Sequence, residues 1–295
     1  MKTALALDVG GTKLAAGVVA SDGRVLARAV CPTPPNGDAD ALFAAVRGVL
    51  AEVRADLTAP IEQEVCGVGC GGPMTAEGEE VSPLNIPGWR SFPLRAALRE
   101  LTGLPVFVDN DAKALALGEG WVGAAAGERD FIAMVVSTGV GGGIVLNGTL
   151  LDGAAGNAGH IGHVIVEPGG RPCACGGRGC LEAEASGTAI AAITGRPPAE
   201  AGPDIVERTG RLVGRAVASV ANLLDLRLAV VAGSVALGFG APFFAAAQAE
   251  LDRSARLDFS RGTRIVPSTL GADAPIVGAA AVGFQGLDPW PRPAG

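Results

Sequence analysis

The sequence lacks the features that mark several classes of protein. Its 295 residues carry a net charge of −7 and contain no cluster of Lys or Arg, which argues against a nucleic-acid-binding surface. The two charge-free stretches, 131–151 and 228–249, are broken by glycines and therefore do not indicate membrane helices. Asp8 and the Gly-Gly-Thr-Lys run after it likewise break the apolar core that a signal peptide needs. We expect an acidic, cytoplasmic protein with no nucleic-acid or membrane partner.

Histidine is scarce, and the cysteines show no disulfide pattern. The chain has two histidines and six cysteines. Cys31, Cys66 and Cys70 are scattered, which fits a reducing compartment. Both histidines and the other three cysteines lie within residues 156–182.

Residues 156–182 predict a structural zinc site. The candidate ligands lie within eighteen residues and are His163, Cys173, Cys175 and Cys180. This set suits tetrahedral zinc and leaves no coordination position open for a substrate. The glycines and prolines between them form turns, so the loop can fold back on an ion. The alternative is a cysteine-rich loop with free thiols.

His160 is not needed as a metal ligand in this scheme. It is either an ordinary loop histidine or, together with Glu182, a side chain that faces a substrate. We expect the second, because a loop held by an ion is a rigid platform for residues that bind a polar ligand.

A glycine-rich turn joins two predicted strands near the N-terminus. Residues 3–8 and 14–19 have strand patterns, and Gly10-Gly11-Thr12-Lys13 lies between them. Such a turn exposes backbone N–H groups that can hold phosphate, with a hydroxyl from Thr12 and a charge from Lys13. Asp8, at the strand end, is a candidate Mg²⁺ ligand. Because the motif is weak by itself, an ordinary hairpin turn is the alternative.

The same pattern returns about 130 residues later, in residues 132–146, where Ser137-Thr138 precede a second glycine turn. This internal repeat predicts two related lobes, each with a phosphate-facing hairpin, and a nucleotide held between the hairpins. A third glycine-containing turn, 232–235, follows a predicted strand over 228–231.

Three polar residues end the strand predicted over 105–108. Asp109, Asn110 and Asp111 precede a predicted helix over 112–119, and one of them is expected to cap it. Capping needs only one residue, and polar strand ends of this kind often bind ligands in α/β proteins. Asn110 can bond a sugar hydroxyl, and Asp111 is a candidate general base.

The remaining pattern predicts the division of the chain. Helical spacing is also clear in four segments: 38–57, 94–101, 204–224 and 242–251. We expect residues 1–120 to form a small N-terminal α/β lobe, to which a C-terminal helix at about 276–287 can return. Residues 121–275 would form a large α/β lobe with the zinc loop 156–182, and the proline-rich end 288–295 would be frayed.

In chain order these motifs resemble the ROK family of bacterial sugar kinases and repressors. The resemblance covers nearly the whole chain and rests on five segments: Asp8 to Lys13, Asn110-Asp111-Ala112, Ser137 to Gly143, His163 with the three cysteines, and Ala232-Gly-Ser234. It implies an α/β, two-lobed, actin-like (ribonuclease H-like) fold with Mg-ATP in the cleft. The implied reaction is transfer of the γ-phosphoryl group to a hexose hydroxyl, usually at C6. Members commonly form homodimers or homotetramers.

The resemblance also implies roles for single residues. Asp111 would be the catalytic base. With the candidates from the residue patterns included, the sugar would be bound by Asn85, Asn110, Asp111, His160, His163 and Glu182. Mg-ATP would be contacted by Asp8, Gly10, Gly11, Thr12, Lys13, Thr138, Gly139, Gly233 and Ser234, the last two at the adenosine.

One position departs from the family pattern, because family glucokinases usually carry Glu where this chain has His160. Histidine can donate or accept a hydrogen bond and can carry charge, so the preferred substituent at the anomeric or C2 end of the sugar can differ. The His-Ile-Gly-His form is similar to bacterial N-acetylmannosamine kinases of the family. Glucose, N-acetylmannosamine and an amino-hexose all stay open, as does polyphosphate in place of ATP.

Two competing functions are a sugar-sensing repressor and a sugar-binding protein without turnover. Family repressors carry a helix-turn-helix segment before the kinase-like part, whereas here the first hairpin begins at residue 3. The presence of Asp8, Thr12, Asn110 and Asp111 argues against a protein without turnover. We expect an ATP-dependent hexose 6-kinase.

Overall fold

The structure, a computed structural model, describes residues 1–57 and 61–288. It contains two compact units. The first unit comprises Met1–Gly123 together with the C-terminal residues from Leu270, and the second unit comprises Ala124–Thr269. Apart from residue 288, the tail predicted to be frayed lies outside the described residues.

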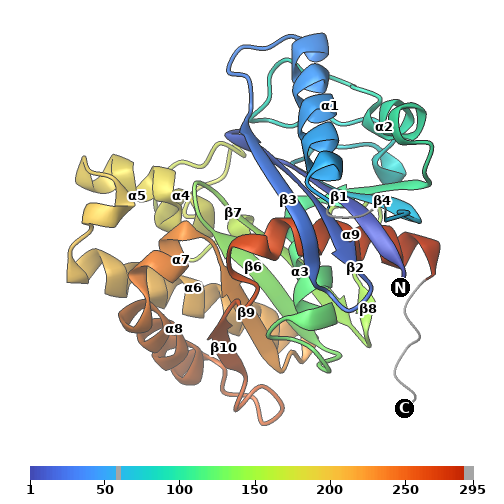
Figure 1. Cartoon of the computed structure of the whole chain (residues 1–295). Coiled ribbons are helices and arrows are strands. Elements are labelled where there is room, and N and C mark those ends of the chain that lie inside the picture. Colours follow the sequence, from blue (N-terminus) through green and yellow to red (C-terminus); the bar gives the residue numbers. More distant parts are fainter. Residues whose placement is uncertain (58–60, 289–295) are drawn as a thin grey trace. The chain divides into compact units, whose positions relative to one another are not determined.

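The first unit is built on a five-stranded sheet in the order β3-β2-β1-β4-β5 (Figure 1). Its strands are β1 (Thr3–Val9), β2 (Lys13–Ala20), β3 (Val25–Pro32), β4 (Val65–Cys70) and β5 (Val106–Asn110). β1 pairs antiparallel with β2 and parallel with β4. The carboxyl ends of β1, β4 and β5 therefore meet at one edge, where parallel sheets place ligand sites.

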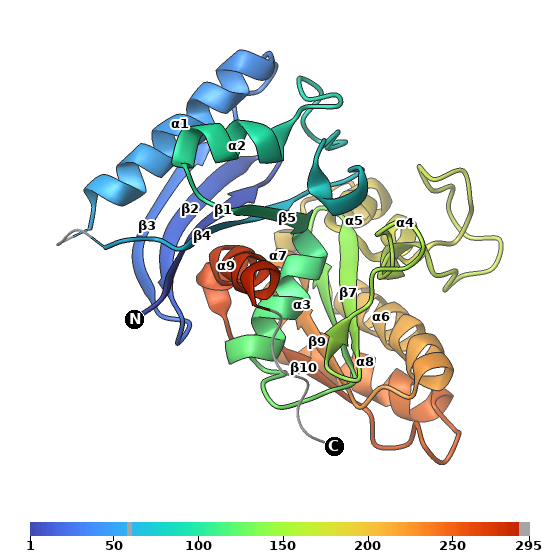
Figure 2. The ribbon, with the colours of Figure 1, turned by 90° about the vertical axis from the view of Figure 1, so that its right-hand side faces the viewer.

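Helices cover both faces of this sheet (Figure 2). α1 (Ala39–Ala55) and α2 (Leu94–Thr102) pack on the face that carries Leu5 and Leu7, as helical spacing predicts. α9 (Ala274–Leu287) packs on the opposite face, where Ala4 and Ala6 are small enough for a close approach. A side chain at Gly67 of β4 would overlap the Ala279 carbonyl. α3 (Asp111–Val122) lies beside α9.

The second unit repeats the same topology. Its strands are β6 (Phe131–Val136), β7 (Val140–Leu146), β8 (Thr149–Leu150), β9 (Leu228–Ala232) and β10 (Arg264–Pro267). The order is β10-β9-β6-β7-β8, so β6 pairs antiparallel with β7 and parallel with β9, as β1 does with β2 and β4. The internal repeat predicted from the two glycine turns is confirmed in the sheet topology. The charge-free stretch 131–151 forms the three strands β6, β7 and β8.

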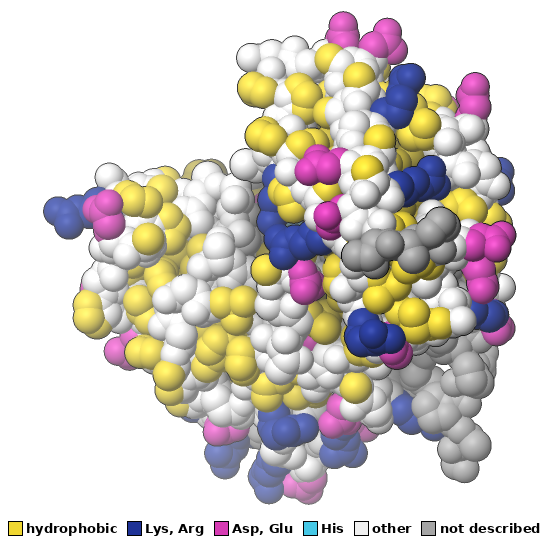
Figure 3. All heavy atoms as spheres, in the orientation of Figure 1, with side chains coloured by type: hydrophobic (Ala, Val, Ile, Leu, Met, Phe, Trp, Pro, Cys, Tyr) yellow, Lys and Arg dark blue, Asp and Glu magenta, His cyan; other side chains and the backbone are white. Residues whose placement is uncertain are grey.

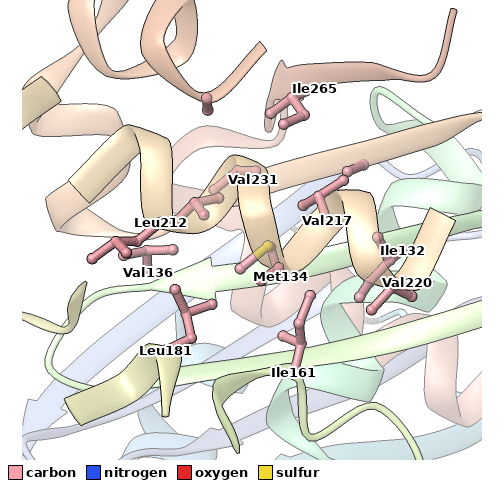
Figure 4. Packing of buried hydrophobic residues seen from close by; sticks show 14 of the residues in the cluster. Ile132, Met134, Val136, Ile161, Leu181, Leu212, Val217, Val220, Val231 and Ile265 are labelled. Carbon is pink, nitrogen blue, oxygen red and sulfur yellow. The ribbon is translucent and has the colours of Figure 1, made fainter. Parts of the chain in front are cut away.

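The core of the second unit lies between its sheet and α6 (Pro203–Leu224), which packs along α8 (Ala241–Ser254). In Figure 4, Ile161 and Leu181, which lie near the two ends of the zinc loop 156–182, point into the same cluster as Met134 and Val136 of β6. The loop is therefore attached to the core at both of its ends.

Short elements complete the chain. The helices α4 (Leu181–Ala185), α5 (Gly187–Thr194) and α7 (Ser234–Phe239) belong to the second unit. The 3-10 turns are η1 (Ala76–Gly78), η2 (Ile161–His163), η3 (Pro198–Glu200) and η4 (Gly271–Asp273). Sequence patterning did not predict β3, β8, β10, α4 or α7, and the last four of these are too short to show a clear period.

Two surface features bear on the expected partners. On the face drawn in Figure 3, Lys and Arg side chains are interspersed with Asp and Glu. Among residues 1–57 and 61–288, every helix is too short or too polar to cross a membrane.

Candidate functional site

The four predicted zinc ligands converge in the second unit. The ligand atoms of His163, Cys173, Cys175 and Cys180 all lie within 4.8 Å of one another. His163 Nδ1 is 3.7 Å from Cys173 Sγ, and the Sγ atoms of Cys175 and Cys180 are 3.7 Å apart. A tetrahedral ion with bonds of about 2.3 Å to sulfur and about 2.05 Å to nitrogen separates such ligands by about 3.8 and 3.6 Å. Because the cysteines are free thiols, the arrangement fits one zinc ion.

Contacts with α6 hold this loop in place. The Glu184 carboxylate, buried at the start of the helical segment after the loop, accepts the Arg171 N–H at 2.6 Å and is paired with Arg208 of α6 at 2.5 Å. Arg215, two turns further along α6, donates to the Val166 carbonyl at 2.6 Å. The loop thus has support from the protein beyond the metal ligands.

The two histidines lie side by side at the edge of the loop. Their ring centroids are 6.0 Å apart with an angle of 30° between the planes, and both side chains are exposed. Since Nδ1 of His163 faces Cys173, its Nε2 is left for a different partner. A histidine can therefore serve the metal and a ligand at once.

Glu182 links the cysteine loop to the β6–β7 turn. Its Oε2 accepts the backbone N–H of Val140 at 2.9 Å, and the missing side chain of Gly139 makes room for this carboxylate. Sequence analysis assigned Glu182 to the sugar alone. The bond joins residues 42 positions apart, and no local pattern reveals it.

The β6–β7 turn, the Gly233 turn and α5 meet at one end of the second sheet. Ser137 Oγ and Ser234 Oγ are 2.9 Å apart, and Thr188 Oγ1 donates to the Thr138 carbonyl at 3.0 Å. Gly233 has φ of +101° and lies against Val136 too closely to carry a side chain.

An open cavity of about 690 Å³ adjoins these turns. Hydroxyl groups line one part of it, from Thr138, Thr188 and Ser234, and apolar side chains line the rest, among them Pro198 and Phe239. This combination suits a planar ring system that is attached to a polar group.

In the first unit, the β1–β2 turn packs directly on the loop that carries Asn85. Gly10 N–H donates to the Lys13 carbonyl at 3.1 Å and closes the turn. A Cβ placed on Gly11 would lie 2.5 Å from Asn85 Cβ, so only glycine fits there. Asn85, an expected sugar-binding residue, and the Gly-Gly-Thr-Lys turn are therefore neighbours.

Asn110 and Asp111 stand at the carboxyl end of β5, where α3 begins. Asn110 is the N-cap, as expected for this segment, and its Oδ1 accepts the Ala112 N–H at 3.0 Å. Asp111 Oδ1 accepts the same N–H at 2.8 Å, and the Asp111 side chain is exposed. Asp109 instead pairs with the buried Lys113 at 2.9 Å.

Asp8, at the end of β1, lies close to Asp111. A Cβ on Gly69, in the strand between them, would lie 3.6 Å from both Asp8 Oδ1 and Asp111 Cα. Burial raises the pKa of Asp8 to about 7, the charge of Asp111 adds to this rise, and Lys13 opposes it. Two carboxylates at one strand edge create an excess of negative charge that a divalent cation would neutralise.

The raised pKa of Asp8 predicts a pH-dependent stability. Between the unfolded pKa of 3.8 and the folded pKa of about 7, the folded state holds more protons, so the free energy of unfolding falls as pH rises. Asp8→Asn removes this loss. Without Mg²⁺, we expect the variant to be more stable than the wild type by roughly 2–4 kcal/mol at pH 8 and by little at pH 4. Urea denaturation at pH values from 4 to 8 measures the free energy of unfolding of both proteins. A difference between them that does not change with pH would contradict the raised pKa of Asp8.

The predicted residues therefore form one set in each unit. The first unit holds Asp8, Gly10, Gly11, Thr12, Lys13, Asn85, Asn110 and Asp111, and the second holds Thr138, Gly139, His160, His163, Glu182, Gly233 and Ser234 with the three cysteines.

Known proteins resemble this chain in sequence and in fold. The model of the ROK family matches residues 4–285. The N-acetylmannosamine kinase of Citrobacter koseri is 39% identical over 251 residues, which cover 80% of this chain and 84% of that protein. The ROK hexokinase from Thermus thermophilus is 34% identical with a TM-score of 0.83, over 97% of this chain and 99% of that one.

A further structure, of a ROK family glucokinase from Streptomyces griseus in complex with glucose and AMPPNP, is 31% identical with a TM-score of 0.81. It covers 96% of this chain and 99% of that chain. By the family match over nearly all of its length, the chain belongs to the ROK family, and in sequence and fold it resembles the sugar kinases of that family.

Proposed function

We propose that this protein is an ATP-dependent sugar kinase that transfers the γ-phosphoryl group to the 6-hydroxyl of a hexose, with N-acetylmannosamine as the preferred substrate. The observation that carries the reaction type is the strand edge with Asp8, Asn110 and Asp111. The resemblance to the Citrobacter koseri enzyme and the His-Ile-Gly-His form at His160 support the choice of sugar.

Asp111 is the proposed general base. Its exposed carboxylate takes the proton of the sugar hydroxyl while that oxygen attacks the γ-phosphorus, and the bond from phosphorus to the bridging oxygen of ADP breaks. Its bond to the Ala112 N–H fixes the side chain at the start of α3. Asn110 Oδ1 serves the helix cap, so its NH₂ group remains to donate to a sugar oxygen.

The phosphates are assigned to the two glycine turns. In the first turn, Gly11 and Thr12 offer backbone N–H groups, Thr12 also offers a hydroxyl and Lys13 an ammonium group, while Gly10 closes the turn through its bond to the Lys13 carbonyl. The Thr138-Gly139 turn offers a second set. Asp8 fits a Mg²⁺ ligand, because the cation would restore the ionised carboxylate that burial disfavours. When bound, Mg²⁺ supplies charge neutralisation for the phosphoryl group.

The cavity beside Gly233 and Ser234 is the proposed adenosine site. Its apolar side chains would contact the base, and its hydroxyl groups would face the ribose and the phosphates. AMPPNP, bound to the Streptomyces griseus glucokinase, is an ATP analogue and supports ATP as the donor.

Asn85, His160, His163 and Glu182 complete the proposed sugar contacts. Zinc would hold His163 through Nδ1 and keep Nε2 directed toward a hydroxyl. The remaining oxygen of Glu182 can accept a hydrogen bond from the sugar, because Oε2 is taken by Val140. From the family resemblance, we also propose a cytoplasmic homodimer or homotetramer.

A panel of sugars tests the choice of substrate. ADP release with Mg-ATP is measured for N-acetylmannosamine, glucose, mannose, N-acetylglucosamine and amino-hexoses. We expect the highest kcat/KM for N-acetylmannosamine. A higher kcat/KM for glucose would assign the protein as a glucokinase instead, and saturable sugar binding without turnover would favour a sensor.

His160 is the residue expected to set this preference. His160→Glu replaces a side chain that can donate by an acceptor-only carboxylate, so we expect the ratio of kcat/KM for N-acetylmannosamine to that for glucose to fall by about tenfold. His160→Gln keeps a donor and serves as the matched control. An unchanged ratio in His160→Glu would show that this position is neutral for specificity.

A further inference from the structure

Thr33 contacts the first glycine turn, although it lies outside the motifs considered above. It directly follows β3 and is 7% exposed. Its Oγ1 donates to the Gly10 carbonyl at 2.6 Å, and its backbone N–H donates to the Thr12 carbonyl at 3.0 Å. One residue therefore engages two carbonyls of the turn.

The two bonds have different origins. The N–H bond continues the β2–β3 ladder, in which Lys13 is paired with Pro32, so any residue except proline would make it. The hydroxyl bond reaches across the turn to Gly10, at the end of the turn nearer β1. A hydroxyl is needed for that contact, because an apolar side chain cannot donate.

These contacts suit a turn that binds anions. Carbonyl oxygens repel phosphate and N–H groups attract it, so a phosphate-binding turn must keep its carbonyls turned away from the ligand. Thr33 engages the carbonyls of Gly10 and Thr12, and the Gly10 N–H engages that of Lys13. On another side, the packing of Gly11 on Asn85 limits movement of the turn.

We propose that Thr33 is a positioning residue for the donor phosphates. Its hydroxyl fixes the peptide that follows Gly10, so that the N–H groups of Gly11 and Thr12 keep the orientation that phosphate binding requires. This inference rests on the proposed function, since it assumes that the turn binds a nucleoside triphosphate.

Three variants of the full chain test it. Thr33→Val keeps the shape and the backbone N–H but loses the hydroxyl, and Thr33→Ser keeps the hydroxyl. Thr209→Val is the matched control, because buried Thr209 in α6 also donates to a carbonyl, that of Ile205 at 2.7 Å, in the other unit. Calorimetry measures the affinity for Mg-AMPPNP, which requires no turnover, and steady-state kinetics gives KM for Mg-ATP and for the sugar.

We expect Thr33→Val to weaken Mg-AMPPNP binding and raise KM for Mg-ATP by about tenfold, the loss of one good hydrogen bond. KM for the sugar should change less than about twofold, and Thr33→Ser should restore nucleotide affinity. Unchanged affinity in Thr33→Val, or an equal loss in Thr209→Val, would overturn the proposal. A wild-type protein that binds no Mg-AMPPNP would overturn the proposed function. If it binds Mg-AMPPNP but shows no turnover, the affinities of the Thr33 variants for Mg-AMPPNP still test the role of Thr33.

Discussion

Asp111→Asn is expected to lower kcat by about 10²- to 10⁴-fold, the usual contribution of a general base. The amide has nearly the shape of the carboxylate and can still accept the Ala112 N–H through its oxygen. The variant should therefore fold, and the dissociation constant for the sugar should stay within several-fold of the wild-type value. The loss appears in kcat because proton removal occurs during the chemical step.

The control for this variant is Asp258→Asn, which makes the same chemical change at a side chain that is 94% exposed and lies in the other unit. It should leave kcat unchanged. Turnover close to wild type in Asp111→Asn, with the sugar and nucleotide saturating, would remove Asp111 from the role of base.

Loss of zinc is expected to have the second large effect. Cys175→Ser removes a ligand from the exposed part of the loop, so bound zinc should fall from about one ion per chain to a small fraction of that. His163 would lose the partner that fixes its ring, and the connection from the loop through Glu182 to Val140 would loosen. We expect KM for the sugar to rise at least about tenfold, as metal sites lose comparable function when their supporting contacts are removed.

Cys31→Ser is the matched control, because Cys31 is a free thiol in the other unit. It should keep both the zinc content and KM for the sugar. Metal analysis and kinetics on the same preparations provide the comparison. A zinc-free Cys175→Ser protein with wild-type KM and thermal stability would show that the ion has no structural role.

Local patterns predicted the parts of this structure that depend on neighbours in sequence. The cluster of His163 with the three cysteines, the two glycine turns and the Asn110 cap each occupy a short stretch whose residue types restrict the possible structures. The repeat of the sheet topology was also predictable, since both turns lie between apolar strands.

Long-range contacts were not predictable in this way. Three hydrogen bonds join residues 23 to 42 positions apart in the sequence. They link Thr33 to Gly10, Val140 to Glu182, and Arg208 to Glu184. Which partners meet depends on the fold, and a single Thr or Glu in a sequence carries no signal of its partner. The close packing of α9 on Gly67 was also not predictable, because a glycine in a strand does not indicate which element packs against it.

The most direct test of the central claim is the identity of the product. Purified protein is incubated with Mg-ATP and N-acetylmannosamine, and the product is examined by ³¹P and ¹H NMR, with Asp111→Asn and a 6-deoxy sugar as blanks. We predict one new phosphate monoester coupled to the C6 protons and equimolar with ADP. The 6-deoxy sugar should give none, and Asp111→Asn should form it at least about a hundredfold more slowly. ADP formed without a sugar phosphate, or a phosphate on another carbon, would contradict the assignment.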